Sequence, residues 1–284
     1  MQISVIIPAY NEETGLGRVL GQLTRASDFG SDIEVIVAAN GCTDRTADVA
    51  REYGVKVVEI ETPSKTAALN AADAVASGFP RIYLDADIEA SPALIRSLAR
   101  AVGQPGVWAA VPRLIVDTGS SSLPVKAYYA INSRLPIFRG RLFGRGCIAL
   151  SREARARFST FPNIIADDMF LDAVVPSDGK REVDLPISVP APRRSGDLVR
   201  RLARSGEGNE EFWQWVTDAA PTEGLAVDPV PQSYRWSWLR VALRRPLLLP
   251  AAACYATVVL MAARLRRSPD WTPRSGWGRP ATTT

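Results

Sequence analysis

The sequence contains no histidine, the side chain that most often serves as a general base or a zinc ligand near neutral pH. This absence excludes a Ser-His catalytic triad and a His-based zinc site, so acid–base chemistry in this chain falls to carboxylates. The cysteines Cys42, Cys147 and Cys254 are far apart and odd in number, which indicates neither a disulfide framework nor a zinc knuckle. Three cysteines without a disulfide framework are typical of a protein in the reducing cytosol.

Two sequence patterns are also missing. Residues Met1 to Ile7 lack a charged region followed by a long apolar core, so we expect no secretory signal. The turn from Pro8 to Glu13 contains no glycine and therefore lacks the Gly-x-Gly-x-x-Gly pattern that lets a backbone approach a dinucleotide pyrophosphate. Hydride transfer on a Rossmann domain is therefore disfavoured.

The composition indicates a globular chain with unevenly placed charge. With 284 residues, of which 46% are hydrophobic, it is long enough for one substantial core and an appendage. The formal net charge is only +4, but basic residues concentrate between Arg193 and Arg204 and between Arg235 and Arg267. Such segments favour phosphate groups or an anionic membrane surface as partners. Nucleic acid is not expected, because no recognisable binding module accompanies them.

Apolar runs typical of strands alternate with segments typical of helices. The predicted strands are residues 3–7, 33–38, 55–60, 81–87 and 108–116, and within residues 143–150 glycines precede a further apolar strand. This alternation predicts an α/β fold with a mostly parallel central sheet flanked by helices on both faces.

The predicted strand 81–87 runs directly into two carboxylates, Asp85 and Asp87. Open α/β sheets bind ligands at the carboxyl ends of their strands. Carboxylate oxygens suit Mg²⁺ or Mn²⁺, and such an ion can neutralise a departing diphosphate. Asp85 and Asp87 are therefore predicted to form the centre of a sugar-nucleotide site, although an Asp-x-Asp taken alone also occurs in solvated turns.

Four short motifs follow one another in the first third of the chain. They are Ile6-Ile7-Pro8-Ala9-Tyr10-Asn11-Glu12-Glu13, Asn40-Gly41-Cys42-Thr43-Asp44, Lys65 with a following Ala-Leu-Asn, and Asp85-Ala86-Asp87. In order and spacing they resemble the family 2 glycosyltransferases, and the ordered set is far more specific than any one motif. The resemblance implies the GT-A fold of nucleotide-diphospho-sugar transferases.

The resemblance also implies donor-binding residues. These are Pro8, Tyr10 and Glu12 at the nucleoside, Asn40 near the base, Lys65 beside the donor, and Asp87 with Asp85 at a Mg²⁺ or Mn²⁺ ion. One departure leaves the nucleotide open, because many members have Asp-Asp-Gly-Ser-Thr-Asp at residues 39–44, and Asn40 adds an amide donor where a carboxylate only accepts. The local sequence alone also allows a plain turn at Asn40 and a solvated lysine at Lys65.

A second acidic pair, Asp167 and Asp168, follows the apolar residues Ile164 and Ile165. Two carboxylates there can simply favour a helix N-terminus. In a chain without histidine, a carboxylate here is also the candidate to deprotonate an acceptor hydroxyl. The position is similar to the family's Glu-Asp or Asp-Asp motif, which implies Asp168 as the catalytic base and Asp167 as a supporting or acceptor-binding group.

Three further segments resemble features of the family. Gly146, before an apolar run, would lie on the acceptor side of the cleft. Arg200 and Arg204 share a predicted helix face and would bind the donor diphosphate. Trp236 ends a Gln-x-x-Arg-Trp pattern found in processive members and would stack on an acceptor sugar. The local sequence equally allows a simple turn, a solvated basic face and an interfacial Arg-Trp pair at these three places.

Residues 246–263 are apolar without a charge, and arginines bracket them at 244, 245, 264, 266 and 267. As a helix they would reach about 27 Å, just enough to cross a bilayer. A span, a helix lying in the membrane interface and a buried helix all stay open. We expect a membrane-associated helix, and we divide the chain into a GT-A domain at 1–230, a basic and apolar helical segment at 231–267, and a flexible tail at 268–284.

Together these patterns predict an inverting, metal-dependent glycosyltransferase at the cytoplasmic face of the cell membrane. It would move a sugar from a nucleoside diphosphate sugar to a hydroxyl acceptor, lipid-linked or part of a cell-envelope glycan. A sugar-phosphate nucleotidyltransferase is the first alternative, but the acidic turn Pro8 to Glu13 differs from the glycine-rich, basic loop usual there. The second is a catalytically silent sugar-nucleotide-binding protein, against which the intact Asp85, Asp87 and Asp168 count.

Overall fold

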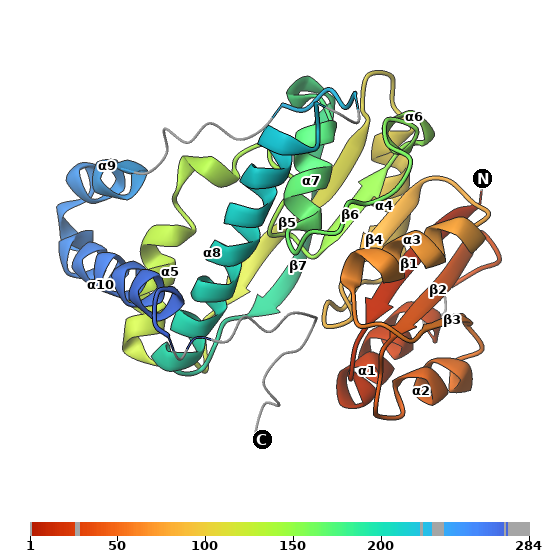
Figure 1. Cartoon of the computed structure of the whole chain (residues 1–284), viewed down its shortest axis with the longest axis horizontal. Coiled ribbons are helices and arrows are strands. Elements are labelled where there is room, and N and C mark those ends of the chain that lie inside the picture. The colour runs from red at the N-terminus through yellow and green to blue at the C-terminus, as the bar shows by residue number, and fades with distance from the viewer. Residues whose placement is uncertain (1, 26–28, 222–223, 229–235, 270, 272–284) are drawn as a thin grey trace.

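The computed structural model describes residues 2–25, 29–221, 224–228, 236–269 and 271. Within these ranges one sheet has seven strands in the order β3-β2-β1-β4-β6-β5-β7 (Figure 1). The strands are β1 (Ile3–Ala9), β2 (Ile33–Asn40), β3 (Lys56–Ile60), β4 (Arg81–Leu84), β5 (Ala109–Asp117), β6 (Cys147–Leu150) and β7 (Lys180–Pro190). Neighbouring strands are parallel except at β6, which runs antiparallel to β4 and β5. The predicted α/β fold with a mostly parallel sheet is confirmed.

Helices cover both faces of the sheet. One core lies under α1 (Glu13–Thr24), α2 (Thr46–Glu52) and α4 (Pro92–Val102). The core of the opposite face lies under α3 (Lys65–Val75), α6 (Arg152–Arg155), α7 (Asp167–Val174) and α8 (Ser195–Asp218). Consecutive residues of β1 enter different cores, Val5 and Ile7 the first and Ile6 the second. Burial on both faces explains why this strand is a continuous apolar run.

β4 ends earlier than the sequence predicts, at Leu84 and not at residue 87. Asp85 starts a turn in which the backbone N–H of Ile88 donates to the Asp85 carbonyl at 3.0 Å. The N–H of Asp85 in turn donates to the carbonyl of Gly146 at 2.8 Å, just before β6. Asp85 is therefore fixed at the carboxyl edge of the sheet, beside the start of the antiparallel strand.

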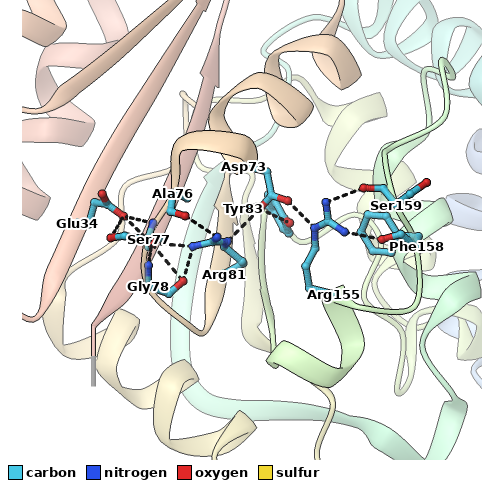
Figure 2. Close-up of polar contacts among 11 residues, drawn as sticks. Glu34, Asp73, Ala76, Ser77, Gly78, Arg81, Tyr83, Arg155, Phe158 and Ser159 are labelled. Carbon is cyan, nitrogen blue, oxygen red and sulfur yellow. Dashed lines mark hydrogen bonds and ion pairs between the residues drawn. The ribbon is translucent and has the colours of Figure 1, made fainter.

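A buried polar network lies at the other end of β4 (Figure 2). Asp73 of α3 places one carboxylate oxygen 3.1 Å from Arg81 Nε and 3.2 Å from the Tyr83 hydroxyl. Its second oxygen lies 2.5 Å from Nε of Arg155 on α6. Both oxygens of Asp73 are thus occupied by protein donors, and the network fastens α3 to the sheet and to α6.

Most of the remaining helices pack at the end of the molecule away from β1–β3 (Figure 1). They are α5 (Leu123–Asn132), η1 (Pro136–Phe138), α9 (Ser237–Arg244), η4 (Pro246–Leu248) and α10 (Leu249–Arg266). The single turn η2 (Ser177–Gly179) lies apart from them, before β7, where Gly179 accepts a hydrogen bond from the N–H of Trp108 at 2.8 Å. Apolar clusters join α10 to α5, α8 and α9, and Tyr255 of α10 stacks on Tyr128 with ring centroids 5.0 Å apart.

The apolar stretch predicted near the C-terminus is helical. Pro250 sits in the first turn of α10, where its missing N–H costs no hydrogen bond. The proposed boundary at residue 230 and most of the proposed tail at 268–284 lie outside the described residues. The division of the chain into three parts therefore stays a prediction.

Candidate active site

A pocket lies at the carboxyl ends of β1 and β4, where α3 and α7 begin. Among its lining residues are six that the sequence analysis selected, namely Pro8, Lys65, Asp85, Gly146, Asp167 and Asp168. Pro8 lies at the end of β1 and Asp85 follows β4, two parallel strands that end at this edge of the sheet, and Lys65 begins α3 there. Gly146 precedes the antiparallel strand β6, which starts at the same edge, and Asp167 and Asp168 begin α7. Carboxylates that are far apart in the sequence therefore share one small space.

Lys65 stands between two of these carboxylates. Its ammonium nitrogen lies 2.8 Å from Asp85 Oδ1 and 3.0 Å from Asp167 Oδ1. Ser64 caps α3 by accepting a hydrogen bond from the N–H of Ala67 at 3.2 Å, which fixes where the helix starts. Burial disfavours the charged lysine, but the charges of Asp167 and Asp85 outweigh it and raise the pKa of Lys65 above its ordinary value. The pocket therefore holds a permanent cation.

Asp168 is held by backbone donors in the first turn of α7. Its Oδ2 accepts from the N–H of Gly144 at 2.7 Å, and its Oδ1 accepts from the N–H of Met169 at 2.8 Å. Burial raises the pKa of Asp168 above its ordinary value, while the hydrogen bond from Gly144 opposes that rise. A carboxylate that is oriented by two donors and has a raised pKa suits a general base.

Asp167 is the more deeply buried member of the acidic pair, with a side chain that is 10% exposed. Burial raises its pKa to about 6, although the Lys65 ammonium acts in the opposite direction. Adjacent carboxylates on one helix turn thus differ in partners, because Asp167 faces a lysine and Asp168 faces backbone N–H groups.

Asp172, which the sequence analysis did not select, organises the loop on which Asp168 depends. Its carboxylate accepts from the N–H of Leu142 at 2.7 Å and pairs with Arg141 at 3.3 Å and Lys180 at 2.9 Å. Asp172 lies four residues after Asp168, on the same face of α7. The helix α7 therefore holds the loop 141–144 by two hydrogen bonds, one to Asp168 and one to Asp172. The four-residue spacing of these two aspartates was the signal for Asp172 that the sequence contained.

Gly146 adopts a left-handed conformation with φ of 67°. A Cβ atom there would meet Cγ1 of Ile88 at 2.7 Å and Oδ2 of Asp85 at 3.3 Å. The segment before β6 can therefore approach the Asp85 turn only with glycine at this position.

The residues predicted at the nucleoside lie at the ends of β1 and β2. The backbone N–H of Glu12 donates to the Thr46 hydroxyl at 2.8 Å, which joins the two loops. Asn40 is fully buried and accepts from the N–H of Ser64 at 2.8 Å. In the part of the chain that the structure describes, its Nδ2 has no hydrogen-bond partner. Tyr10, Glu12 and Asn40 are not among the described residues that line the pocket.

The structure does not bring every predicted residue to the pocket. The described lining omits Asp87, which is half-buried in the turn after β4, and both Arg200 and Arg204 of α8. Arg200 is exposed and pairs with Asp197 at 2.5 Å. The roles predicted for these residues stay predictions.

Trp236, predicted on the acceptor side of the cleft, lies away from the pocket, and its predicted role stays a prediction. It stands at the start of α9, 65% exposed, with its ring 6.5 Å from that of Trp238, and not in the pocket lining as described. The helix α9 packs on α5 and α10, at the far end of the molecule from β1–β3 (Figure 1). Gln232 to Arg235, the rest of the motif, lie outside the described residues.

The donor set at the pocket fits a divalent cation that binds together with its nucleotide. Carboxylate oxygens of Asp85 and Asp167 already converge on one positive charge, the ammonium of Lys65. Within the described ranges, no three His, Cys, Asp or Glu side chains form a group able to hold a metal ion. Mg²⁺ usually takes one or two carboxylates and completes its shell with substrate phosphates and water, so a partial protein site is the expected one.

Comparison with known proteins identifies the fold and the family. A mannosyltransferase from Pyrobaculum calidifontis, solved with GDP-Man and Mn²⁺, shares the fold with a TM-score of 0.56 at 22% identity over 93% of this chain and 78% of its own. The fold is thus that of the GT-A glycosyltransferases. The sequence model of Glycosyl transferase family 2 matches residues 4–152, more than half of the chain, and the chain belongs to that family.

Two relatives illustrate how far the similarity extends. Validoxylamine A glucosyltransferase of Streptomyces hygroscopicus subsp. limoneus is 35% identical over 109 residues, which cover 36% of this chain and 24% of that protein. Undecaprenyl-phosphate 4-deoxy-4-formamido-L-arabinose transferase of Edwardsiella ictaluri is 32% identical over 110 residues, which cover 36% of this chain and 34% of that protein. The chain therefore matches about a quarter to a third of the length of these relatives.

Proposed function

We propose that this chain transfers a sugar from a nucleoside diphosphate sugar to a hydroxyl group of an acceptor, with inversion at the anomeric carbon. The observation that carries the proposal is the meeting of Asp85 and Asp168 in one pocket at the carboxyl edge of the sheet. One carboxylate follows the strand where such folds bind ligands, and the other begins a helix across the pocket. Membership of family 2 supports the same reaction class.

Asp168 is the proposed general base. The hydrogen bonds from Gly144 and Met169 hold its carboxylate in one orientation, so that it can take the proton of the acceptor hydroxyl as the oxygen attacks the anomeric carbon. A single displacement with the base on one side of the sugar and the diphosphate leaving on the other inverts the configuration. Burial, which raises the pKa of Asp168, makes the carboxylate a better proton acceptor than an exposed aspartate.

Asp87 and Asp85 are the residues that would hold a Mg²⁺ or Mn²⁺ ion, which when bound supplies positive charge for the departing diphosphate. Lys65 contributes a second positive charge at the same place, because its ammonium contacts Asp85 directly. The unpaired Nδ2 of Asn40, in the described part of the chain, supports the prediction that this amide contributes to donor binding. Pro8, Tyr10 and Glu12 complete the proposed donor side.

A membrane-borne acceptor is part of the proposal. The name of the Edwardsiella ictaluri relative specifies transfer involving undecaprenyl phosphate, a lipid phosphate. The apolar helix α10, long and apolar enough to cross a membrane by composition, agrees with work at a membrane surface. We place the enzyme at the cytoplasmic face of the membrane. The proposed donor, a nucleotide sugar, fits the cytosol, and so do the free cysteines of the described residues, because the cytosol keeps thiols reduced.

A donor screen tests the proposal. Purified protein is incubated with Mn²⁺ and UDP-, GDP- or dTDP-sugars, and release of nucleoside diphosphate is measured for the wild type and for Asp87→Ala. The matched control is Glu89→Ala, an exposed carboxylate two residues further along the same turn. Release that needs Asp87 but not Glu89 supports glycosyl transfer. Pyrophosphate released from a nucleoside triphosphate would indicate the nucleotidyltransferase instead, and binding without turnover would indicate the silent protein.

A further inference from the structure

The exposed large apolar side chains of the described residues concentrate on α9, η4 and α10. We call six of them the C-terminal apolar face: Leu239, Leu243, Leu247, Leu249, Leu260 and Met261, which are between 40% and 95% exposed. Leu239 and Leu243 share one side of α9, and Leu249 and Leu260 share one side of α10. An apolar surface of this kind on one part of a protein marks an interaction site.

Arginines surround this face and acidic residues are missing from it. Between residues 229 and 269 the sequence has seven arginines and neither Asp nor Glu. Arg240 and Arg244 lie on the exposed side of α9, and Arg264 and Arg267 lie at the end of α10. Long arginine side chains can reach phosphate groups while the neighbouring leucines enter an apolar layer.

The opposite side of α10 packs against α5 and α8. Near its start, Cys254 contacts the carbonyl of Pro124 at 3.5 Å, and Tyr255 stacks on Tyr128 of α5. Near its end, Arg266 donates to the carbonyl of Gly206 at 2.7 Å and pairs with Glu210 at 2.8 Å, both on α8. Because these contacts hold one side of α10 against α5 and α8, lipid cannot surround the helix on all sides.

We propose that the C-terminal apolar face docks on an anionic phospholipid bilayer, with α9 and α10 lying in the interface and not crossing it. The leucines enter the boundary between headgroups and acyl chains, and the arginines contact lipid phosphates. The length and composition of residues 246–263 left three arrangements open, namely a span, an interfacial helix and a buried helix, and this proposal selects the interfacial helix.

Charge favours a bilayer over a second copy of this chain as the occupant. Two copies that met through this face would bring two sets of arginines together, and residues 229–269 themselves contain no carboxylate to pair with them. An anionic lipid surface supplies the missing negative charge over the whole area, and each arginine near it adds to the attraction.

Docking of this face has a consequence for the acceptor side, which rests on the proposed function. Phe138 of η1 packs in the same apolar cluster as α9 and α10, and its ring lies 5.9 Å from that of Phe143. The next residue, Gly144, is a hydrogen-bond donor to Asp168. The loop that orients the proposed base is therefore attached to the part of the molecule that touches the bilayer.

Vesicle sedimentation of the full chain tests the docking surface. We expect it to bind phosphatidylcholine vesicles that contain phosphatidylglycerol at least about tenfold more tightly than vesicles of phosphatidylcholine alone. Added salt should weaken this binding, and alkaline carbonate should release the protein. Replacement of Leu243, Leu247 and Leu260 by Gln, or of Arg240, Arg244 and Arg264 by Gln, should each weaken binding by about tenfold or more.

The matched control replaces Val75, Ile115 and Leu185 by Gln, three exposed apolar residues on α3, β5 and β7, and should leave vesicle binding unchanged. Circular dichroism confirms that each variant is folded. The docking proposal fails if neither triple variant weakens binding, if carbonate leaves the protein in the membrane as it leaves a spanning helix, or if light scattering shows a dimer that the leucine variant dissociates. The vesicle assay needs no sugar donor, and Asp168→Asn should bind vesicles like the wild type. Failure of the docking proposal and failure of the proposed enzymatic function therefore give different results.

Discussion

The two ends of α3 and β4 carry charged networks that differ in how completely they are closed. In the buried network of Figure 2 the helix supplies the carboxylate, Asp73, and the strand supplies the cation, Arg81. At the pocket the signs are reversed, because the helix supplies Lys65 and the carboxylate of Asp85 follows the strand. The same two elements thus build both networks.

Exposure separates the two networks. The side chains of Asp73 and Arg81 are 6% and 8% exposed, and both carboxylate oxygens of Asp73 have protein partners. The side chain of Asp85 is 39% exposed, on the side that faces the pocket. A network whose carboxylate oxygens are all paired with protein donors can only stabilise the fold. A network with a partly exposed carboxylate has oxygen atoms that can still bind a ligand. Paired substitutions should therefore separate stability from activity.

The largest effect on activity is expected for Asp168→Asn. The amide keeps the shape but cannot take a proton, so the rate of sugar transfer should fall by about 10²–10⁴-fold. The free energy of unfolding should change little, because two effects oppose each other. A carboxylate with a raised pKa is removed, which stabilises the fold, but the amide has one acceptor oxygen and loses one of the two backbone hydrogen bonds. Transfer rates and urea unfolding are measured beside Asp178→Asn, an exposed aspartate after α7 that should behave as the wild type.

The reverse result is expected for Asp73→Asn. Loss of this charge leaves Arg81 and Arg155 without their buried partner, and the free energy of unfolding should fall by about 3–5 kcal/mol. The transfer rate of the protein that remains folded should change little, because Asp73 does not line the pocket as described. If Asp73→Asn and Asp168→Asn each lost activity and stability to the same extent, the distinction between a stabilising network and a ligand-binding network would be wrong.

Gly146→Ala tests the close approach at the open network. The added Cβ would meet Ile88 at 2.7 Å in a left-handed conformation, so either the loop or the Asp85 turn must move. We expect a loss of about 1–3 kcal/mol in stability together with a loss of transfer activity. The control is Gly140→Ala, which has a similar φ of 64° but no atom within 4 Å of the added Cβ, and which should affect stability without affecting transfer.

The smallest effect is a pH dependence of stability from Asp167. Its pKa is raised to about 6 in the folded state, from an ordinary value of 3.8. Between these values the unfolded chain loses the proton while the folded protein keeps it, so stability falls as pH rises from about 4 to about 6. Urea unfolding across this range should show the fall in the wild type and a flatter profile in Asp167→Asn. A profile of equal slope in both proteins would contradict the assignment.

Much of the pocket could be predicted because its short motifs stand directly beside strands and helices that the sequence pattern also predicts. The rule that ligands bind at the carboxyl ends of strands predicted the place of Asp85. The resemblance to family 2 implied Lys65 beside the donor and Asp168 as the base. Asp172 escaped prediction because its partners, Arg141 and Lys180, lie on a loop and a strand that no local pattern joins to α7. The five-residue motif that ends at Trp236 does not fix where α9 packs, so the acceptor-side role of this residue stays a prediction.

By itself, the sequence determined the α/β alternation, the apolar runs and the reliance on carboxylates, because periodicity and composition act locally along the chain. Only the tertiary structure decided that β6 runs antiparallel beside β4, that Lys65 stands between Asp85 and Asp167, and that α10 lies along α5 and α8. These features depend on contacts between residues far apart in the chain, and the energy of such contacts comes from burial and pairing that exist only once the chain is folded.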